Sequence, residues 1–150
     1  MPATLKMMDH PLADAEEQLR VIDGYPVPRF ESMLEESGLH PLEAIGIDTL
    51  QINVGKLCNQ TCKHCHVDAG PDRTEIMTRE TMQNCLDALD RCAEIKNVDL
   101  TGGAPEMNPD FRWFVEQIRS RKRHVMVRSN LTILVVGKYR DMPEFFRDNE

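Results

Sequence analysis

Residues 49–66, TLQINVGKLCNQTCKHCH, form an alternating apolar segment that runs directly into three cysteines. In residues 49–54 apolar and polar side chains alternate, which is typical of a β-strand with one buried face. Cys58, Cys62 and Cys65 then follow at the spacing Cys-x3-Cys-x2-Cys. The sequence therefore predicts a strand over 49–54 that leads into a cysteine-bearing loop.

The three cysteines indicate a metal centre. Thiolates are soft ligands that suit iron–sulfur clusters, and a cluster held by three cysteines keeps one iron free for another ligand. Structural zinc, with His64 or His66 as the fourth ligand, is the alternative, because closed sites of three cysteines and one histidine are common. The chain has 5 cysteines, and an odd number with three in one loop suits a reducing compartment without disulfides.

The composition is that of a soluble globular protein, with 41% hydrophobic and 29% charged residues in a chain of 150. The net charge of −7 argues against a nucleic-acid partner, although residues 119–123 form a local basic cluster. No apolar stretch reaches the roughly 18 residues of a membrane span, and the first residues lack the pattern of a signal peptide. We therefore expect a cytoplasmic protein with no nucleic-acid or membrane partner.

Strands and helices alternate after the cysteine loop. Thr78 is a candidate N-cap for a helix over 78–92, and Asn108 with Pro109 predicts the start of a second helix over 109–121. The apolar stripe of the first helix includes Cys85 and Cys92, which we expect in the core. Further strands are predicted at 97–101 and 124–129, and a third helix near Pro143.

Residues 1–48 differ from the rest of the chain. Prolines interrupt two short helical stretches, 13–22 and 30–37. We expect this segment to be an N-terminal leader that packs on the regular unit formed by residues 49–150.

Distinctive residues follow the second and third strands. TGGAPE (101–106) ends the second strand and RSNLT (128–132) ends the third. Loops at the carboxyl ends of parallel strands meet at one edge of a sheet, so both should approach the cysteines. A glycine pair taken alone is more often a tight turn than a ligand-binding segment, and its position after a strand favours the second interpretation.

The three strands also share a polar face. Gln51, Asn53, Asp99, Thr101 and Arg128 alternate with apolar residues. A parallel strand that is covered on both faces is usually apolar throughout. The polar row therefore predicts a lumen or cleft that holds a polar ligand. The charged residues after the cysteine loop, Asp68, Asp72, Arg73 and Glu75, are expected to be solvated.

Together these motifs resemble the radical S-adenosylmethionine (radical SAM) superfamily. The resemblance implies a [4Fe–4S] cluster on Cys58, Cys62 and Cys65. S-Adenosylmethionine would bind the open iron and be cleaved on reduction to a 5′-deoxyadenosyl radical. The implied fold is α/β, a partial parallel (β/α) barrel with only the first three βα units present, so residues 49–150 would be the N-terminal portion of a truncated barrel.

The resemblance also implies which residues contact the cofactor. It implies that the glycine segment binds the methionine end of S-adenosylmethionine and that His64, just before the third cysteine, packs near the adenine. The turn after the third strand would also contact this cofactor. The cofactor-binding residues so implied are His64, Gly102, Gly103, Ala104, Glu106, Ser129 and Asn130.

A closer resemblance, over about 48–134, is to the arsenosugar-biosynthesis radical SAM proteins. Residues 49–62, HCHVDAGP (64–71), TGGAPE (101–106) and NLTIL (130–134) carry it. It implies transfer of the deoxyadenosyl group to a methylated trivalent arsenical, with an electron donor such as flavodoxin or ferredoxin. Relatives often have cysteine in place of Ser129 and run well beyond residue 150. A zinc module and a noncatalytic fragment that keeps the cluster motif are the alternatives.

Overall fold

The computed structural model describes residues 3–150, which form two compact units. One unit comprises residues 5–46, and the other comprises residues 47–150 together with Ala3 and Thr4. In the part of the chain so described, no helix is long and apolar enough to cross a membrane.

The smaller unit contains the two short helices that the sequence predicts. Helix α1 (Ala15–Asp23) begins at Asp14, whose side chain accepts hydrogen bonds from the backbone N–H groups of Glu16 and Glu17. Helix α2 is Phe30–Glu36, and neither helix has a buried residue. The packing of residues 1–48 on the barrel stays a prediction.

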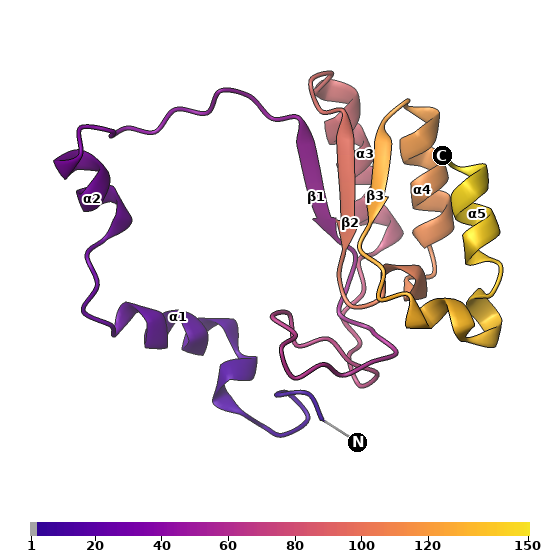
Figure 1. The fold of residues 1–150 in the computed structure, drawn as a ribbon, viewed down its shortest axis with the longest axis horizontal. Coiled ribbons are helices and arrows are strands. Elements are labelled where there is room, and N and C mark those ends of the chain that lie inside the picture. Colours follow the sequence, from indigo (N-terminus) through magenta and orange to yellow (C-terminus); the bar gives the residue numbers. More distant parts are fainter. Residues whose placement is uncertain (1–2) are drawn as a thin grey trace. The chain divides into compact units, whose positions relative to one another are not determined.

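The larger unit is built on a parallel sheet of three strands (Figure 1). Strands β1 (Thr49–Asn53), β2 (Asn97–Thr101) and β3 (His124–Val127) pair in the order β1-β2-β3. Ile52 is paired with Leu100, which is in turn paired with Val127. The predicted α/β class is confirmed, since three parallel strands in an open sheet are what the first βα units of a partial barrel provide.

Three helices accompany the sheet. Helix α3 (Arg79–Arg91) follows β1, α4 (Phe111–Ser120) follows β2, and α5 (Met142–Asp148) follows β3. Thr78 caps α3 as predicted, because its Oγ1 accepts a hydrogen bond from the N–H of Thr81 at 3.2 Å. Helix α4 begins later than predicted, with Asp110 as the N-cap residue in place of Asn108.

Asn108 does not cap α4 in the expected way because its side chain joins three segments. Its Nδ2 donates to the carbonyl oxygens of Val54 and Met77, each at 3.0 Å. Its Oδ1 accepts from the N–H of Asp110 at 2.9 Å. This buried amide therefore ties the segment before α4 to the end of β1 and to the segment that leads into α3.

The core lies between the helices and one face of the sheet. Cys85 is half-buried against this core, whereas Cys92 is exposed, so the expectation of a buried Cys92 was wrong. The reason is that α3 ends at Arg91 and Cys92 is its C-cap. The buried core residues are Ile52, Val54, Met82, Leu86, Leu89, Ile95, Val98, Leu100, Phe111, Phe114, Val115, Ile118 and Met142.

Polar side chains on the other face are bonded across all three strands. Gln51 Nε2 donates to Asp99 Oδ2 at 2.8 Å, and Arg128 donates to the same carboxylate from Nε at 3.0 Å and from Nη2 at 2.6 Å. Asp99 is only 3% exposed, whereas Gln51 and Arg128 are exposed. Three members of the predicted polar row, Gln51, Asp99 and Arg128, are therefore connected by hydrogen bonds, and the role of the row as the lining of a lumen stays a prediction.

The Asp99 network predicts a pH dependence of stability. Hydrogen bonds from Arg128, with a smaller contribution from Gln51, hold the pKa of Asp99 below its ordinary value. Asp99 therefore contributes stability above the pKa of the unfolded chain, about 3.9, and this contribution is lost as the pH falls through the lower pKa of the folded chain. Asp99→Asn should lower the free energy of unfolding at neutral pH, and by a smaller amount at about pH 3, below the pKa of the unfolded chain. Urea unfolding at both pH values measures this, and an equal loss at both would contradict it.

Candidate functional site

The loops after β1 and β2 pack directly on one another below the strand ends (Figure 1). The N–H of Gly103 donates to the carbonyl oxygen of Gly55, and the N–H of Ala104 donates to that of Leu57, both at 2.9 Å. A Cβ on Gly102 would lie 2.5 Å from the Gly55 oxygen, and the φ of Gly102 is +149°. The primary role of these glycines is therefore to let the two backbones come into contact, which a side chain would prevent.

This contact narrows what the glycine segment can offer to a ligand. The two N–H groups of Gly103 and Ala104 are already bonded to the cysteine loop. The prediction that Gly102, Gly103 and Ala104 present backbone groups to a cofactor therefore concerns their other backbone groups, and of these the carbonyl oxygen of Ala104 already accepts from the N–H of Met107 at 2.9 Å.

The three cysteines are free thiols with different environments. Cys58 is buried, at 6% exposed, Cys65 is half-buried, and Cys62 is exposed. Cys65 packs against the small buried cluster that contains Cys58, Ala69, Ala104 and Ile133. Across residues 3–150 no three histidine, cysteine, aspartate or glutamate side chains lie close enough together to hold a metal ion. Binding by all three cysteines therefore requires their side chains to come closer together, and Cys62 is the exposed one of the three.

The loop that carries the three cysteines has no regular secondary structure between its ends. Its ends are fixed, because the N–H of Cys58 donates to the Gly70 oxygen at 3.1 Å. Between them residues 59–69 form neither helix nor strand, and a turn hydrogen bond joins Cys65 to Cys62. The N–H of Ala69 donates to Cys65 Sγ at 3.3 Å. Three free thiols in one loop, with N–H donors to sulfur, are a donor set that fits an iron–sulfur cluster.

The turn after β3 reaches the same cysteine. Asn130 Nδ2 donates to Cys58 Sγ at 3.5 Å and to Asn59 Oδ1 at 2.8 Å. Thr132 closes a ring, because its Oγ1 accepts from Asn59 Nδ2 and donates to Asn130 Oδ1, both at 3.0 Å. No local pattern singles out Asn59 or Thr132, because their role depends on a contact between loops that are far apart in the sequence.

Arg73 is a buried clamp on the cysteine loop, so the expectation that it is solvated was wrong. It is 4% exposed, and its Nη1 donates to both the backbone oxygen and Oδ2 of Asp68, at 2.9 and 2.8 Å. Its Nε and Nη2 donate to the two carboxylate oxygens of Glu75. Asp68, at φ +49°, lies three residues after Cys65. The sequence signal for this clamp is the placement of Arg73 between two acidic residues, five positions before it and two positions after it.

Removal of the Arg73 clamp should loosen the loop. Arg73→Ala deletes a buried ion pair from one side, and because Glu75 is partly exposed we expect a loss of about 2 to 3 kcal/mol in unfolding free energy. Arg147→Ala, which removes an exposed surface pair with Asp148, should change it by less than about 0.5 kcal/mol. Chemical denaturation measures both, and equal effects of the two substitutions would exclude a clamp.

Glu106 is buried without a hydrogen-bond partner. It is 4% exposed, and neither carboxylate oxygen is bonded within the described residues. An ionised carboxylate in such a place is costly unless a donor or cation pairs with it. Ala104 and Met107, on either side of Pro105 and Glu106, pack in the Cys58 cluster. An ammonium group of a ligand bound beside the cysteine loop would supply the missing partner.

For the other predicted site residues the structure gives no contact with Cys58. His64 and His66 are exposed, and neither joins a metal-binding group within residues 3–150. Ser129 is half-buried, and its Oγ accepts a hydrogen bond from the N–H of Leu131 at 3.1 Å. The adenine contact of His64 and the cofactor contact of Ser129 stay predictions.

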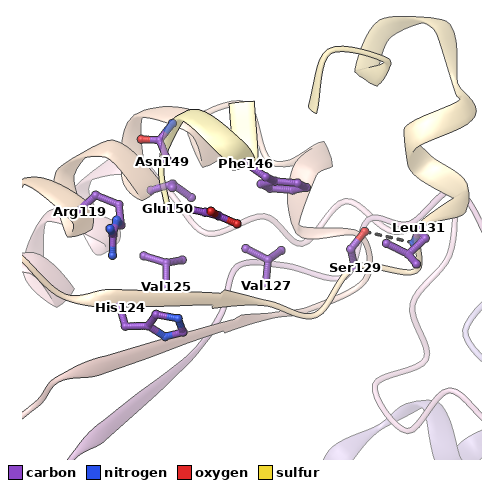
Figure 2. Close-up of a pocket in the computed structure, with 10 residues that line it drawn as sticks. Arg119, His124, Val125, Val127, Ser129, Leu131, Phe146, Asn149 and Glu150 are labelled. Carbon is purple, nitrogen blue, oxygen red and sulfur yellow. Dashed lines mark hydrogen bonds between the residues drawn. The ribbon is translucent and has the colours of Figure 1, made fainter. Parts of the chain in front are cut away.

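A groove of about 540 Å³ runs along the outer edge of β3. Figure 2 shows Val125 and Val127 pointing into it from the strand, with Phe146 on the opposite side. Ser129 and Leu131 lie at one end of it, and Arg119 of α4 lies near the other. None of its lining residues belongs to the cysteine loop or the glycine segment, and the groove approaches the Cys58 site at Ser129 and Leu131, which flank Asn130.

Comparison with known proteins gives one family and several distant relatives. The chain is 28% identical over 90 residues to a probable GTP 3′,8-cyclase of Pyrococcus horikoshii, which is 60% of this chain and 29% of that protein. A probable GTP 3′,8-cyclase of Methanothermobacter marburgensis is 34% identical over 88 residues, which is 57% of this chain and 28% of that protein. The chain thus spans less than a third of the length of these curated relatives.

The family match covers most of the larger unit. The model of the radical SAM superfamily matches residues 52–149, a range that includes the cysteine loop, the glycine segment and the Asn130 turn. The chain therefore belongs to the radical SAM superfamily.

Proposed function

We propose that this chain is the part of a radical SAM enzyme that binds a [4Fe–4S] cluster and S-adenosylmethionine. Proteins of the superfamily use both groups. The observation that carries the proposal is the set of contacts around Cys58, which is packed against Ala104 from the end of β2 and bonded by Asn130 from the end of β3. Three strand ends thus meet at one buried thiol, at the edge where ligands bind in parallel α/β sheets.

Cys58, Cys62 and Cys65 are the residues that would hold the cluster. When bound, the cluster supplies the electron that cleaves the sulfonium carbon–sulfur bond of S-adenosylmethionine. The protein's own contribution is positional. The side chains packed around Cys58 shield it from water. Backbone hydrogen bonds hold the glycine segment against the cysteine loop. Glu106 offers a buried carboxylate to the ammonium of the methionine moiety.

For the substrate we propose a methylated trivalent arsenical that receives the deoxyadenosyl group, a step of arsenosugar biosynthesis. The proposal rests on the resemblance of residues 48–134 to that type of protein. GTP is the second candidate, because the curated relatives are named probable GTP 3′,8-cyclases. The electron would come from a small redox protein such as flavodoxin or ferredoxin.

Anaerobic reconstitution with iron and sulfide tests the first part of this proposal. The chain should take up about four irons, show a visible absorption that bleaches with dithionite, and release 5′-deoxyadenosine when S-adenosylmethionine is added. Stoichiometric zinc without that absorption would favour the zinc module instead. A cluster that never cleaves S-adenosylmethionine would favour a noncatalytic fragment.

The substrate is tested separately, with the whole protein. Incubation with S-adenosylmethionine, a reductant and either dimethylarsinous acid or GTP should give a deoxyadenosylated arsenical from the first and no cyclised nucleotide from the second. Mass spectrometry of the products distinguishes the two. Product from GTP alone would contradict the arsenical proposal and leave the cluster proposal intact.

A further inference from the structure

We propose that Asn130 sets the reduction potential of the cluster by donating a hydrogen bond to the Cys58 thiolate. This inference rests on the proposed function, because it concerns the cluster that Cys58 would hold. Asn130 then acts on the sulfur of Cys58, a role different from the S-adenosylmethionine contact that the sequence resemblance implies.

The hydrogen bonds around Asn130 fix the orientation of its amide. Its Oδ1 accepts from the N–H of Ile133 at 3.1 Å and from the Thr132 hydroxyl at 3.0 Å. A backbone N–H can only donate, so the oxygen of the amide must face Ile133. The NH₂ group must then face the opposite way, where it meets Cys58 Sγ and Asn59 Oδ1.

The remaining members of the ring maintain this orientation. Asn59 Oδ1 is occupied by Asn130, so Asn59 Nδ2 is left to bond Thr132, and Thr132 in turn donates back to Asn130. Each group has its partner, and a satisfied network is more rigid than its separate bonds. Asn130 therefore presents a fixed donor to a sulfur that is itself 6% exposed.

A donor in this place acts on the redox equilibrium. One-electron reduction adds negative charge to a cluster and its thiolate ligands, and a hydrogen bond to the thiolate stabilises the more negative state. The low exposure of Cys58 strengthens the effect, because water does not compete for the sulfur. The three cysteines are also unequal, since Cys65 receives a backbone donor from Ala69 while Cys62 is exposed.

Asn130→Asp and Asn130→Ser test the role of the donor. Aspartate can still accept from Ile133 and Thr132 but offers no N–H to the sulfur, and the serine hydroxyl is too short to replace the amide. Each variant should lower the ratio of reduced to oxidised cluster by about tenfold at a fixed potential, which is about 59 mV for a one-electron couple. Redox titration followed by electron paramagnetic resonance measures the shift.

Thr132→Val is the matched control. It removes both hydrogen bonds of the Thr132 hydroxyl, the one from Asn59 and the one to Asn130, but leaves the Ile133 contact that orients Asn130. Its cluster should titrate within about twofold of the wild-type ratio. Unchanged potentials in both Asn130 variants, with a changed affinity for S-adenosylmethionine, would overturn the inference in favour of a direct cofactor contact.

A measurement on the wild-type chain tests the same hydrogen bond even if the variants do not assemble the cluster. With ¹⁵N in the asparagine side chains, pulsed electron paramagnetic resonance of the reduced cluster should detect a weak nitrogen coupling from Asn130 Nδ2. Absence of that coupling would overturn the inference even if the cluster cleaves S-adenosylmethionine. If the wild-type chain binds no cluster, this inference and the proposed function both fail.

Discussion

Replacing Cys58 with alanine is expected to leave a folded chain that cannot hold the cluster. Cys58 is the buried member of the cysteine loop and the point where all three strand ends meet. Iron content should fall from about four per chain to below about one, and release of 5′-deoxyadenosine should fall at least about 100-fold. Iron analysis and chromatography of the nucleoside product measure the two effects.

Two other cysteines provide controls for this substitution. Cys92 is exposed at the end of α3, and Cys85 is half-buried in the same helix, where burial raises the pKa of its thiol. A protonated thiol is a poor metal ligand. Cys85→Ala and Cys92→Ala should keep full iron content, and loss of iron in either variant would contradict the assignment of the three loop cysteines.

Replacing Gly103 with alanine should have the second large effect. A Cβ there would overlap the carbonyl oxygen of Leu57 and lie 2.8 Å from that of Lys56, and both are backbone atoms of the cysteine loop. Because backbone cannot rotate away as a side chain can, the two loops must separate. We expect a loss of about 3 kcal/mol in unfolding free energy and loss of cluster loading in the folded fraction.

Gly137→Ala is the matched control for Gly103. A Cβ at Gly137 meets nothing within 4 Å, so the substitution should change stability by less than about 1 kcal/mol. Thermal unfolding and iron content together give the comparison. A Gly103→Ala variant that is as stable as wild type and fully loaded would show that the glycine segment does not need close contact with the cysteine loop.

The parts of this protein that sequence patterns predict are those with local causes. The alternation of Leu50, Ile52 and Val54 depends only on the two-residue period of a strand, and it predicts the buried face of β1. The spacing of Cys58, Cys62 and Cys65 likewise lies within one loop. The same reasoning predicts the starts of α3 and β2, because capping and strand signals act over a few residues.

Long-range contacts explain what the sequence did not predict. Asn108 lies two residues before the N-cap of α4, and no local pattern indicates that its NH₂ group bonds Val54, 54 residues earlier. The Asn59–Asn130 bond spans 71 residues, and no periodic pattern points to it. Arg73 was expected in solvent because charge is usually exposed, but two carboxylates compensate its burial. Glu106 is unusual for the opposite reason, since nothing in the described protein compensates it.

The central claim is that the cysteine loop holds a cluster with one iron left open for S-adenosylmethionine. Electron paramagnetic resonance of the dithionite-reduced, reconstituted chain, recorded before and after addition of S-adenosylmethionine, tests it most directly. The account predicts a [4Fe–4S] signal whose shape changes when the cofactor binds the open iron. A signal that does not respond, because a histidine or a further thiolate already occupies that iron, would contradict it.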